Sequence, residues 1–147
     1  MMRYLFNNSG GQKQYLFPAK KHYMVISKQN QLAHENTTWN RELEFFKQEN
    51  AYLKTSLSVI IDSRDDKEFL RLAEYFQNLF LLKDELINEL KCGILNHDEE
   101  IKHDLRNDKI LNEILKGQEK LRKQMNYFET DFSRLKNEFN QLLTQYL

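Results

Sequence analysis

The stretch from residue 111 to residue 146 carries the feature that most restricts the fold of this chain. Its apolar residues recur with steps that alternate strictly between three and four, and ten of eleven positions are apolar or aromatic. This heptad spacing places the residues on one face of an α-helix that packs along its length. We therefore expect a long helix over residues 108–146. The stripe consists of Leu111, Ile114, Gln118, Leu121, Met125, Phe128, Phe132, Leu135, Phe139, Leu142 and Tyr146.

Turn-forming residues are scarce in the rest of the chain, which favours further long helices. Among 147 residues, Pro18 is the one proline, and only two glycines, Gly93 and Gly117, follow residue 38. A chain of this length normally forms one domain with a sizeable core. Helical spacing indicates two more helices, over about 38–61 and 66–105. We predict an all-α fold: an antiparallel three-helix coiled-coil-like bundle with one short and two long helices.

The two connections between these helices carry capping signals. In "DSRDD" (62–66), Asp65 is followed three residues later by Glu68, which resembles a capping box. In "RND" (106–108), Asn107 or Asp108 would cap the last helix. Around "NLFLL" (78–82) the second helix is apolar nearly all round. Such a helix has to contact more than one neighbour.

Residues 1–37 look different and are predicted to form a basic, extended N-terminal arm or a short irregular segment. They hold five Lys/Arg residues against one acidic residue, while residues 38–147 hold 17 basic against 21 acidic residues. A hairpin, a docked arm and disorder all fit this segment. Its cations alternate with aromatic residues, which suggests an alternative function as a binding module for an anionic partner such as nucleic acid. Docking on the acidic helices is the favoured interpretation, and nucleic-acid binding is not expected.

The unequal helix lengths predict self-association. A short first helix would pack on residues 66–88 and 125–146, so residues 90–123 would form a bare two-helix hairpin. A second copy of the chain would cover this hairpin, and we therefore expect a homodimer. The predicted association surface consists of Ile94, Leu95, Ile101, Leu105, Ile110 and Leu115.

Three polar residues interrupt the apolar seams, namely Asn50, His97 and Gln118. Buried polar residues at such positions often fix helix register and partner number, whereas at an exposed seam edge they cost nothing. Both interpretations remain open. We expect His97 to share a hydrogen bond with Gln118, and Asn50 to lie near Gln77 and Asn78.

A second stripe on the first helix repeats every seven residues, through Phe45, Tyr52 and Val59. It would be either a partner-binding edge or a contact for the N-terminal arm.

The segment "GILNHDEEIKHDL" (93–105) concentrates histidines and carboxylates. Glu100 and His103 match the Glu-x-x-His motif of di-iron bundles, but those sites require the motif twice together with further glutamates. The motif occurs once here, so a solvated helix face is expected and a metal-binding bundle is a remote alternative. We predict no catalytic, cofactor-binding or metal-binding residues, and no enzymatic activity.

The lone Cys92 excludes an intrachain disulfide and suits a reducing compartment. No apolar run has the length that a membrane span needs. We therefore expect a cytoplasmic protein that does not enter membranes.

Three helical segments, "WNRELEFFKQE" (39–49), "EYFQNLFLLKDELINELK" (74–91) and "RLKNEFNQLL" (134–143), resemble a set of short uncharacterised bacterial proteins. The resemblance covers roughly residues 32–147. It implies a cytoplasmic three-helix protein and carries over no site residues. The expected function is that of a structural or adaptor protein that self-associates and binds a protein partner.

Overall fold

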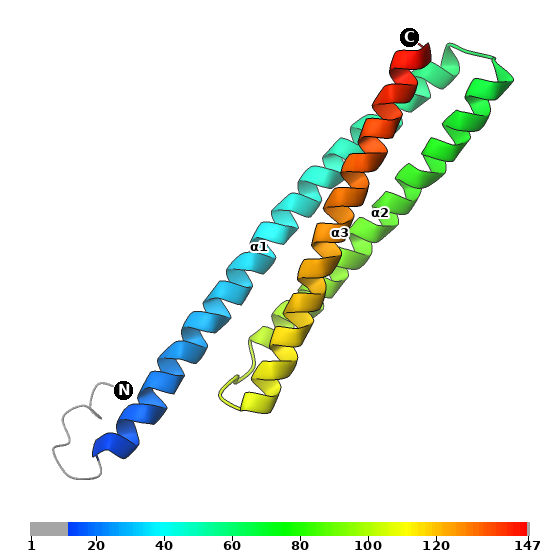
Figure 1. Cartoon of the computed structure of the whole chain (residues 1–147). Helices are drawn as coiled ribbons and strands as arrows, with labels where there is room; N and C mark the ends of the chain where they lie inside the picture. Colours follow the sequence, from blue (N-terminus) through cyan, green and yellow to red (C-terminus); the bar gives the residue numbers. More distant parts are fainter. Residues whose placement is uncertain (1–11, 147) are drawn as a thin grey trace.

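The computed structural model describes residues 12–146, with their side chains from residue 20 onward. These residues form three helices: α1 (Gln12–Asp62), α2 (Lys67–Ile101) and α3 (Asp108–Tyr146). The helices lie along one another as a bundle with a short connection at each end (Figure 1). The predicted all-α helical bundle is confirmed, and the described residues include no strand.

Helix α1 differs from the predicted short first helix. It begins at Gln12, so residues 12–37, which were expected to form an arm or irregular segment, continue the helix without a break. With 51 residues, α1 is longer than α2 (35 residues) and α3 (39 residues). The reason is that the apolar stripe of α1, buried at Trp39, Leu43 and Phe46, continues upstream of Trp39 with the same alternating steps of four and three residues. At those positions buried Val25 and Leu32 alternate with the polar residues Gln29 and Asn36.

Side-chain caps define where α2 and α3 begin. The Asp66 carboxylate accepts a hydrogen bond from the backbone N–H of Glu68 at 3.0 Å, so the cap of α2 lies one residue after the predicted Asp65. The Asn107 side chain accepts from the backbone N–H of Lys109 at 2.9 Å and caps α3. Caps of this kind satisfy backbone donors that have no partner within the helix.

Helix α2 ends at Ile101 instead of continuing to the predicted residue 105. Gln29 of α1 donates from its side-chain amide to the carbonyl oxygens of Ile101 at 2.8 Å and His103 at 3.0 Å. These carbonyl oxygens accept no hydrogen bond from within α2. Gln29 of α1 therefore provides the hydrogen-bond donor that they lack at the end of the helix. Leu105 lies beyond the helix and is nevertheless fully buried.

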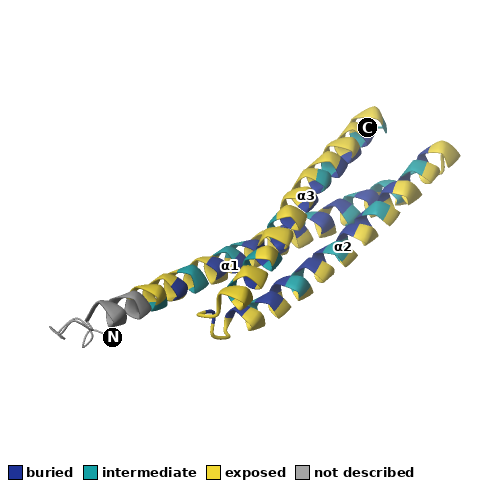
Figure 2. Ribbon diagram, turned by 60° about the horizontal axis from the view of Figure 1, so that its bottom comes forward, coloured by how far each residue is buried: buried dark blue, intermediate teal, exposed yellow. Residues whose placement is uncertain are grey.

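The main core is built from aromatic side chains of all three helices. Phe46 of α1 packs edge-on against Phe128 of α3, with ring centroids 5.4 Å apart. Phe76 and Phe80 of α2 flank Phe139 of α3 at 5.5 and 5.1 Å. Aromatic pairs at these distances and tilts add to the free energy gained from burying their area. The buried residues follow the inward faces of the helices (Figure 2).

A second, smaller core lies at the end of the bundle where α2 leads into α3. Val25 and Leu32 of α1 pack there with Ile101, Leu105 and Ile114. The N-terminal half of α1 therefore covers the end that was expected to be a bare two-helix hairpin.

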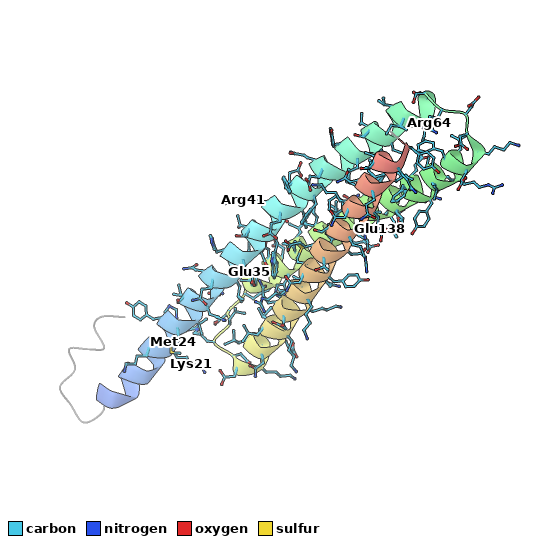
Figure 3. All side chains as sticks on the ribbon, turned by 45° about the horizontal axis from the view of Figure 1, so that its top comes forward. Lys21, Met24, Glu35, Arg41, Arg64 and Glu138 are labelled. Atoms are coloured by element: carbon cyan, nitrogen blue, oxygen red, sulfur yellow. The ribbon has the colours of Figure 1, made fainter. Side chains whose placement is uncertain are left out.

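At the opposite end of the bundle, Arg64 contacts residues of both α2 and α3 (Figure 3). It follows α1 and donates a hydrogen bond to the carbonyl oxygen of Tyr146, the last residue of α3, at 2.8 Å. Its guanidinium also lies 5.1 Å from the ring centroid of Phe69 and 4.9 Å from that of Tyr146. The cation thus contacts both the C-terminal end of α3 and the aromatic side chains that close the core.

Candidate functional site

A buried polar layer separates the two cores. Each helix contributes one buried polar side chain to it: Asn36 of α1, His97 of α2 and Gln118 of α3, which are 0, 6 and 1% exposed. Gln118 donates to the Asn36 side-chain oxygen at 2.9 Å, and Asn36 donates to the Asp98 carboxylate at 2.6 Å. These bonds connect α3 to α1 and α1 to α2 at a single level of the bundle.

Glu35 and Arg122 extend this layer to the surface. The Arg122 guanidinium donates to both carboxylate oxygens of Glu35, at 2.7 and 3.0 Å, and Gln118 donates to the same carboxylate at 2.8 Å. Burial alone would raise the pKa of Glu35. The hydrogen bonds from Arg122 and Gln118 and the positive charge of Arg122 outweigh it and hold the pKa below 4.5.

His97 lies against the backbone of α3 at Gly117. A Cβ atom on residue 117 would come within 2.8 Å of His97 Cε1, so the close approach depends on the glycine. His97 Nε2 is buried without a hydrogen-bond partner, and Nδ1 lies 3.6 Å from a Glu100 carboxylate oxygen. The expected hydrogen bond between His97 and Gln118 is not among those of the described residues. Gln118 donates to α1 instead, because α1 extends to this level.

Asn50 occupies a second buried polar position, 0% exposed. Its side-chain amide donates to the carbonyl oxygen of Phe80 at 2.8 Å and to the Asp84 carboxylate at 2.7 Å. The predicted neighbours, Gln77 and Asn78, lie less than two turns before Asp84 on the same helix. The interpretation of the polar seam residues as an exposed edge is therefore wrong, since Asn50, His97 and Gln118 are all buried. Their role in setting register remains a prediction.

Lys83 is a buried charge that the sequence prediction did not include. It is 4% exposed, its ammonium bonds the Asp131 carboxylate, and it lies 5.6 Å from the Phe128 ring centroid. The hydrogen bond from Lys83 lowers the pKa of Asp131, burial opposes it, and Arg134 lowers it further. The signal was present in the sequence, because Lys83 falls between Phe80 and Ile87 with the seam steps of three and four.

The predicted association surface is largely covered by the chain itself. Ile94, Ile101 and Leu105 are 0, 4 and 0% exposed, so they belong to the cores. Leu115 is half-buried against the smaller core, and only Leu95 and Ile110 are exposed, at 61 and 40%. The prediction of this surface was wrong because it assumed that no part of α1 reaches residues 90–123.

Another apolar surface runs along the outside of α2, and we call it the outer seam. Its members are alternately three and four residues apart, as are the buried residues of α2 that face the core. Tyr75 and Leu82 are 54 and 45% exposed, while the other three members are half-buried beside the main core. The outer seam consists of Leu72, Tyr75, Leu79, Leu82 and Leu86.

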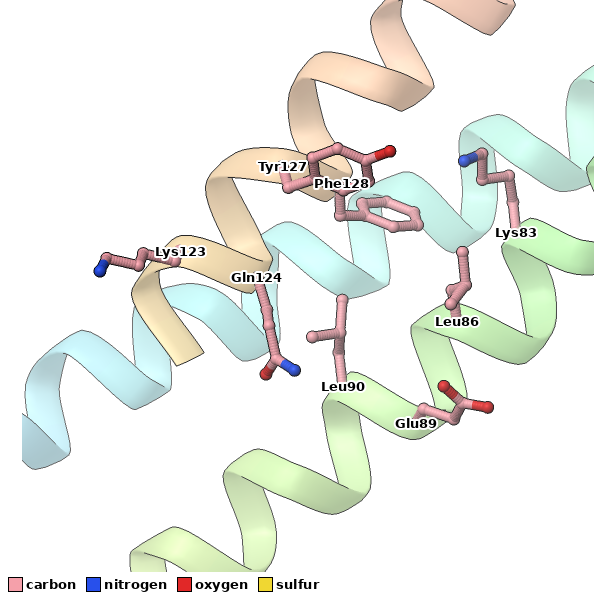
Figure 4. A pocket seen from close by; sticks show the side chains of 8 residues that line it. All are labelled: Lys83, Leu86, Glu89, Leu90, Lys123, Gln124, Tyr127 and Phe128. Atoms are coloured by element: carbon pink, nitrogen blue, oxygen red, sulfur yellow. The ribbon is translucent and has the colours of Figure 1, made fainter. Parts of the chain in front are cut away.

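The outer seam leads into a pocket of about 340 Å³ between α2 and α3. Leu86 and Leu90 of α2 and Phe128 of α3 line its apolar part, and Tyr127, 70% exposed, lies at its α3 side (Figure 4). Apolar surface therefore continues from the outer seam across to α3.

The second stripe on α1 is also exposed, with Phe45, Tyr52 and Val59 at 56, 72 and 64%. Phe45 and Tyr52 line a groove toward α3, across which Lys136 and Glu49 form an ion pair at 2.7 Å. The described residues of α1 continue as helix and do not fold back over this stripe.

The structure also locates the residues on which the alternative functions depend. No three His, Cys, Asp or Glu side chains among them are grouped as metal ligands. Glu100 and His103 are exposed on α2 and the turn that follows it. Of the cations assigned to the basic arm, Lys21 pairs with Asp108 of α3 at 3.0 Å. None of the helices, over residues 12–146, combines the length and the hydropathy that crossing a bilayer would require.

Comparisons of the chain with models of protein families, with curated proteins and with solved structures found no match. The interpretation of the site therefore depends on the geometry described above.

Proposed function

We propose that this chain is a non-enzymatic structural or adaptor protein that acts through self-association and binding of a protein partner. The observation that carries the proposal is the outer seam of α2, a second heptad-spaced apolar stripe that the bundle leaves partly exposed. Apolar surface in this form is the kind that helices bury against one another. Within the bundle, the heptad seams support an antiparallel coiled-coil-like arrangement of the three helices.

We further propose that the associated form is a homodimer in the cytoplasm. Cys92 is a free, exposed thiol, which suits a reducing compartment. The buried polar layer supports a structural role for the interior, because Gln118 bonds Asn36 and Asn36 bonds Asp98, which connects the three helices to one another. Function is thus assigned to the surface of the bundle.

The test is the molar mass of the intact chain and two variants by size exclusion with light scattering. Tyr75→Glu/Leu82→Glu places charge on the outer seam at exposed positions, and should reduce a dimer to the mass of one chain. Leu95→Glu/Ile110→Glu places the same charge on the exposed residues of the originally predicted surface, and should leave the mass unchanged. An intact chain that stays monomeric overturns the proposal, and circular dichroism verifies that each variant is folded.

A further inference from the structure

We propose that the outer seam binds the outer seam of a second copy of the chain, with the two α2 helices antiparallel. This inference rests on the proposed function and specifies its surface, partner and register. A homodimer of this kind requires the outer seam to be complementary to itself, which a partner of a different sequence would not require.

The apolar positions of the outer seam meet this requirement. In antiparallel packing, two positions that are three residues apart on one helix face two positions that are three residues apart on the other, in reverse order. With Leu72 opposite Leu82 of the second copy, Tyr75 lies opposite Leu79, and the same pairs recur on the other side of the two-fold axis. Each exposed residue, Tyr75 and Leu82, is then covered by a half-buried leucine of the other copy.

The charged residues beside the outer seam favour this register. Arg71, Asn78 and Glu85 follow one another every seven residues along the exposed side of the outer seam. In the register above, Arg71 of each copy faces Glu85 of the other, and Asn78 faces its own equivalent at the two-fold axis. Neither Arg71 nor Glu85 forms an ion pair with any residue that the structure describes, so both are free for such a contact. A shift of one heptad would bring Glu85 opposite Asn78 and lose the charge pairing.

Disulfide trapping tests the register directly. In a Cys92→Ser background, Asn78→Cys should form an intermolecular disulfide under mild oxidation, because the two copies of residue 78 meet at the axis. Asn88→Cys is the matched control, since Asn88 is exposed on α2 but lines the groove toward α1. A disulfide at residue 78 and none at residue 88 supports the proposal. Equal crosslinking at both positions, or none at residue 78, overturns it.

Charge reversal tests the same contact without cysteines. Arg71→Glu and Glu85→Arg should each weaken dimerisation by roughly 3- to 30-fold, because each places two like-charge contacts in the symmetric dimer. The double variant Arg71→Glu/Glu85→Arg should restore the affinity. Failure of the double variant to restore it overturns the inference.

The two proposals fail in different ways. If the intact chain is dimeric but residue 78 does not crosslink and charge reversal has no effect, the antiparallel α2 contact is wrong while self-association stands. If the intact chain is monomeric, self-association itself is wrong.

Discussion

His97 and Gly117 approach each other so closely that a methyl group on residue 117 would lie 2.8 Å from His97 Cε1. We expect Gly117→Ala to destabilise the fold by about 1–2 kcal/mol, because overpacking outweighs the gain of about 1 kcal/mol in helix propensity. Gly93→Ala is the control, since its new Cβ would lie 3.4 Å from Leu121 Cδ2, at ordinary contact distance. It should stabilise slightly. Urea unfolding measures the free energy change of both variants. Equal effects would contradict the close contact between residue 117 and His97.

Asn50 keeps a buried side-chain oxygen without a hydrogen-bond partner. Asn50→Leu removes that unsatisfied oxygen but also the hydrogen bonds to Phe80 and Asp84, so we expect stability to rise by no more than about 1 kcal/mol. If Asn50 sets the register, the variant should also show a changed or mixed oligomer mass. Thermal unfolding and light scattering are measured on the same sample. A lower melting temperature with an unchanged mass would exclude the register role.

Lys83 and Asp131 are expected to respond asymmetrically to substitution. Asp131→Asn leaves a buried ammonium without its carboxylate and should cost about 3–5 kcal/mol. Lys83→Met removes that charge and leaves Asp131 bonded to Arg134, so it should cost less than about 1.5 kcal/mol. Urea unfolding at pH 7 compares the two. A larger loss from Lys83→Met would contradict the described pairing.

Two glutamates of α1 should contribute to pH dependence with opposite sign. The pKa of Glu35 is lowered in the fold, so its stabilisation is present above its ordinary pKa of 4.5 and is lost as pH falls through the folded value. Burial and the charge of Glu129 raise the pKa of Glu42, so stability falls as pH rises above its ordinary pKa of 4.5, and the loss is complete above the folded value.

Glu35→Gln should accordingly lower the melting temperature at pH 7 and have little effect at acidic pH. Glu42→Gln should raise the melting temperature at pH 7 and likewise have little effect at acidic pH. Melting curves from pH 3 to pH 7 provide the test. The same sign for both variants at neutral pH would refute the assignment.

The smaller core should depend on the first half of α1. Leu32 is 3% exposed among apolar residues of α2, α3 and their connection, so Leu32→Ala should cost about 2–5 kcal/mol. It should also increase proteolysis within residues 102–107, the connection whose Leu105 packs with Leu32 in the smaller core. Ile26→Ala, at a position that is 39% exposed, is the control and should have a small effect. If Leu32→Ala matched the control, α1 would not pack on this end in solution.

Helix α3 was predictable in full because its seam contains a single polar position, Gln118, and its heptad steps never change. The first half of α1 was not, although its steps are the same. Gln29 and Asn36 occupy alternate positions of the apolar stripe there. Whether such polar residues stabilise the packing of a helix depends on partners that are distant in the sequence. Gln29 bonds the end of α2 and Asn36 bonds Gln118 and Asp98, and no local pattern reveals such contacts.

This single error explains why the predicted association surface failed. Ile101 and Leu105 were correctly identified as apolar residues that need to be covered, but their partner was taken to be a second chain instead of α1. The outer seam was visible only as an unusually broad apolar face around residues 78–82. Separating its residues from the core required the three-dimensional arrangement, because Leu79 and Phe80 are adjacent in sequence and lie in different seams.

Sedimentation equilibrium of the intact chain, over a dilution series, tests the central claim most directly. Self-association through the outer seam predicts a species of twice the chain mass of 17.8 kDa that dissociates to single chains on dilution. A mass of one chain at every concentration would contradict it, and would mean that the outer seam remains exposed to water.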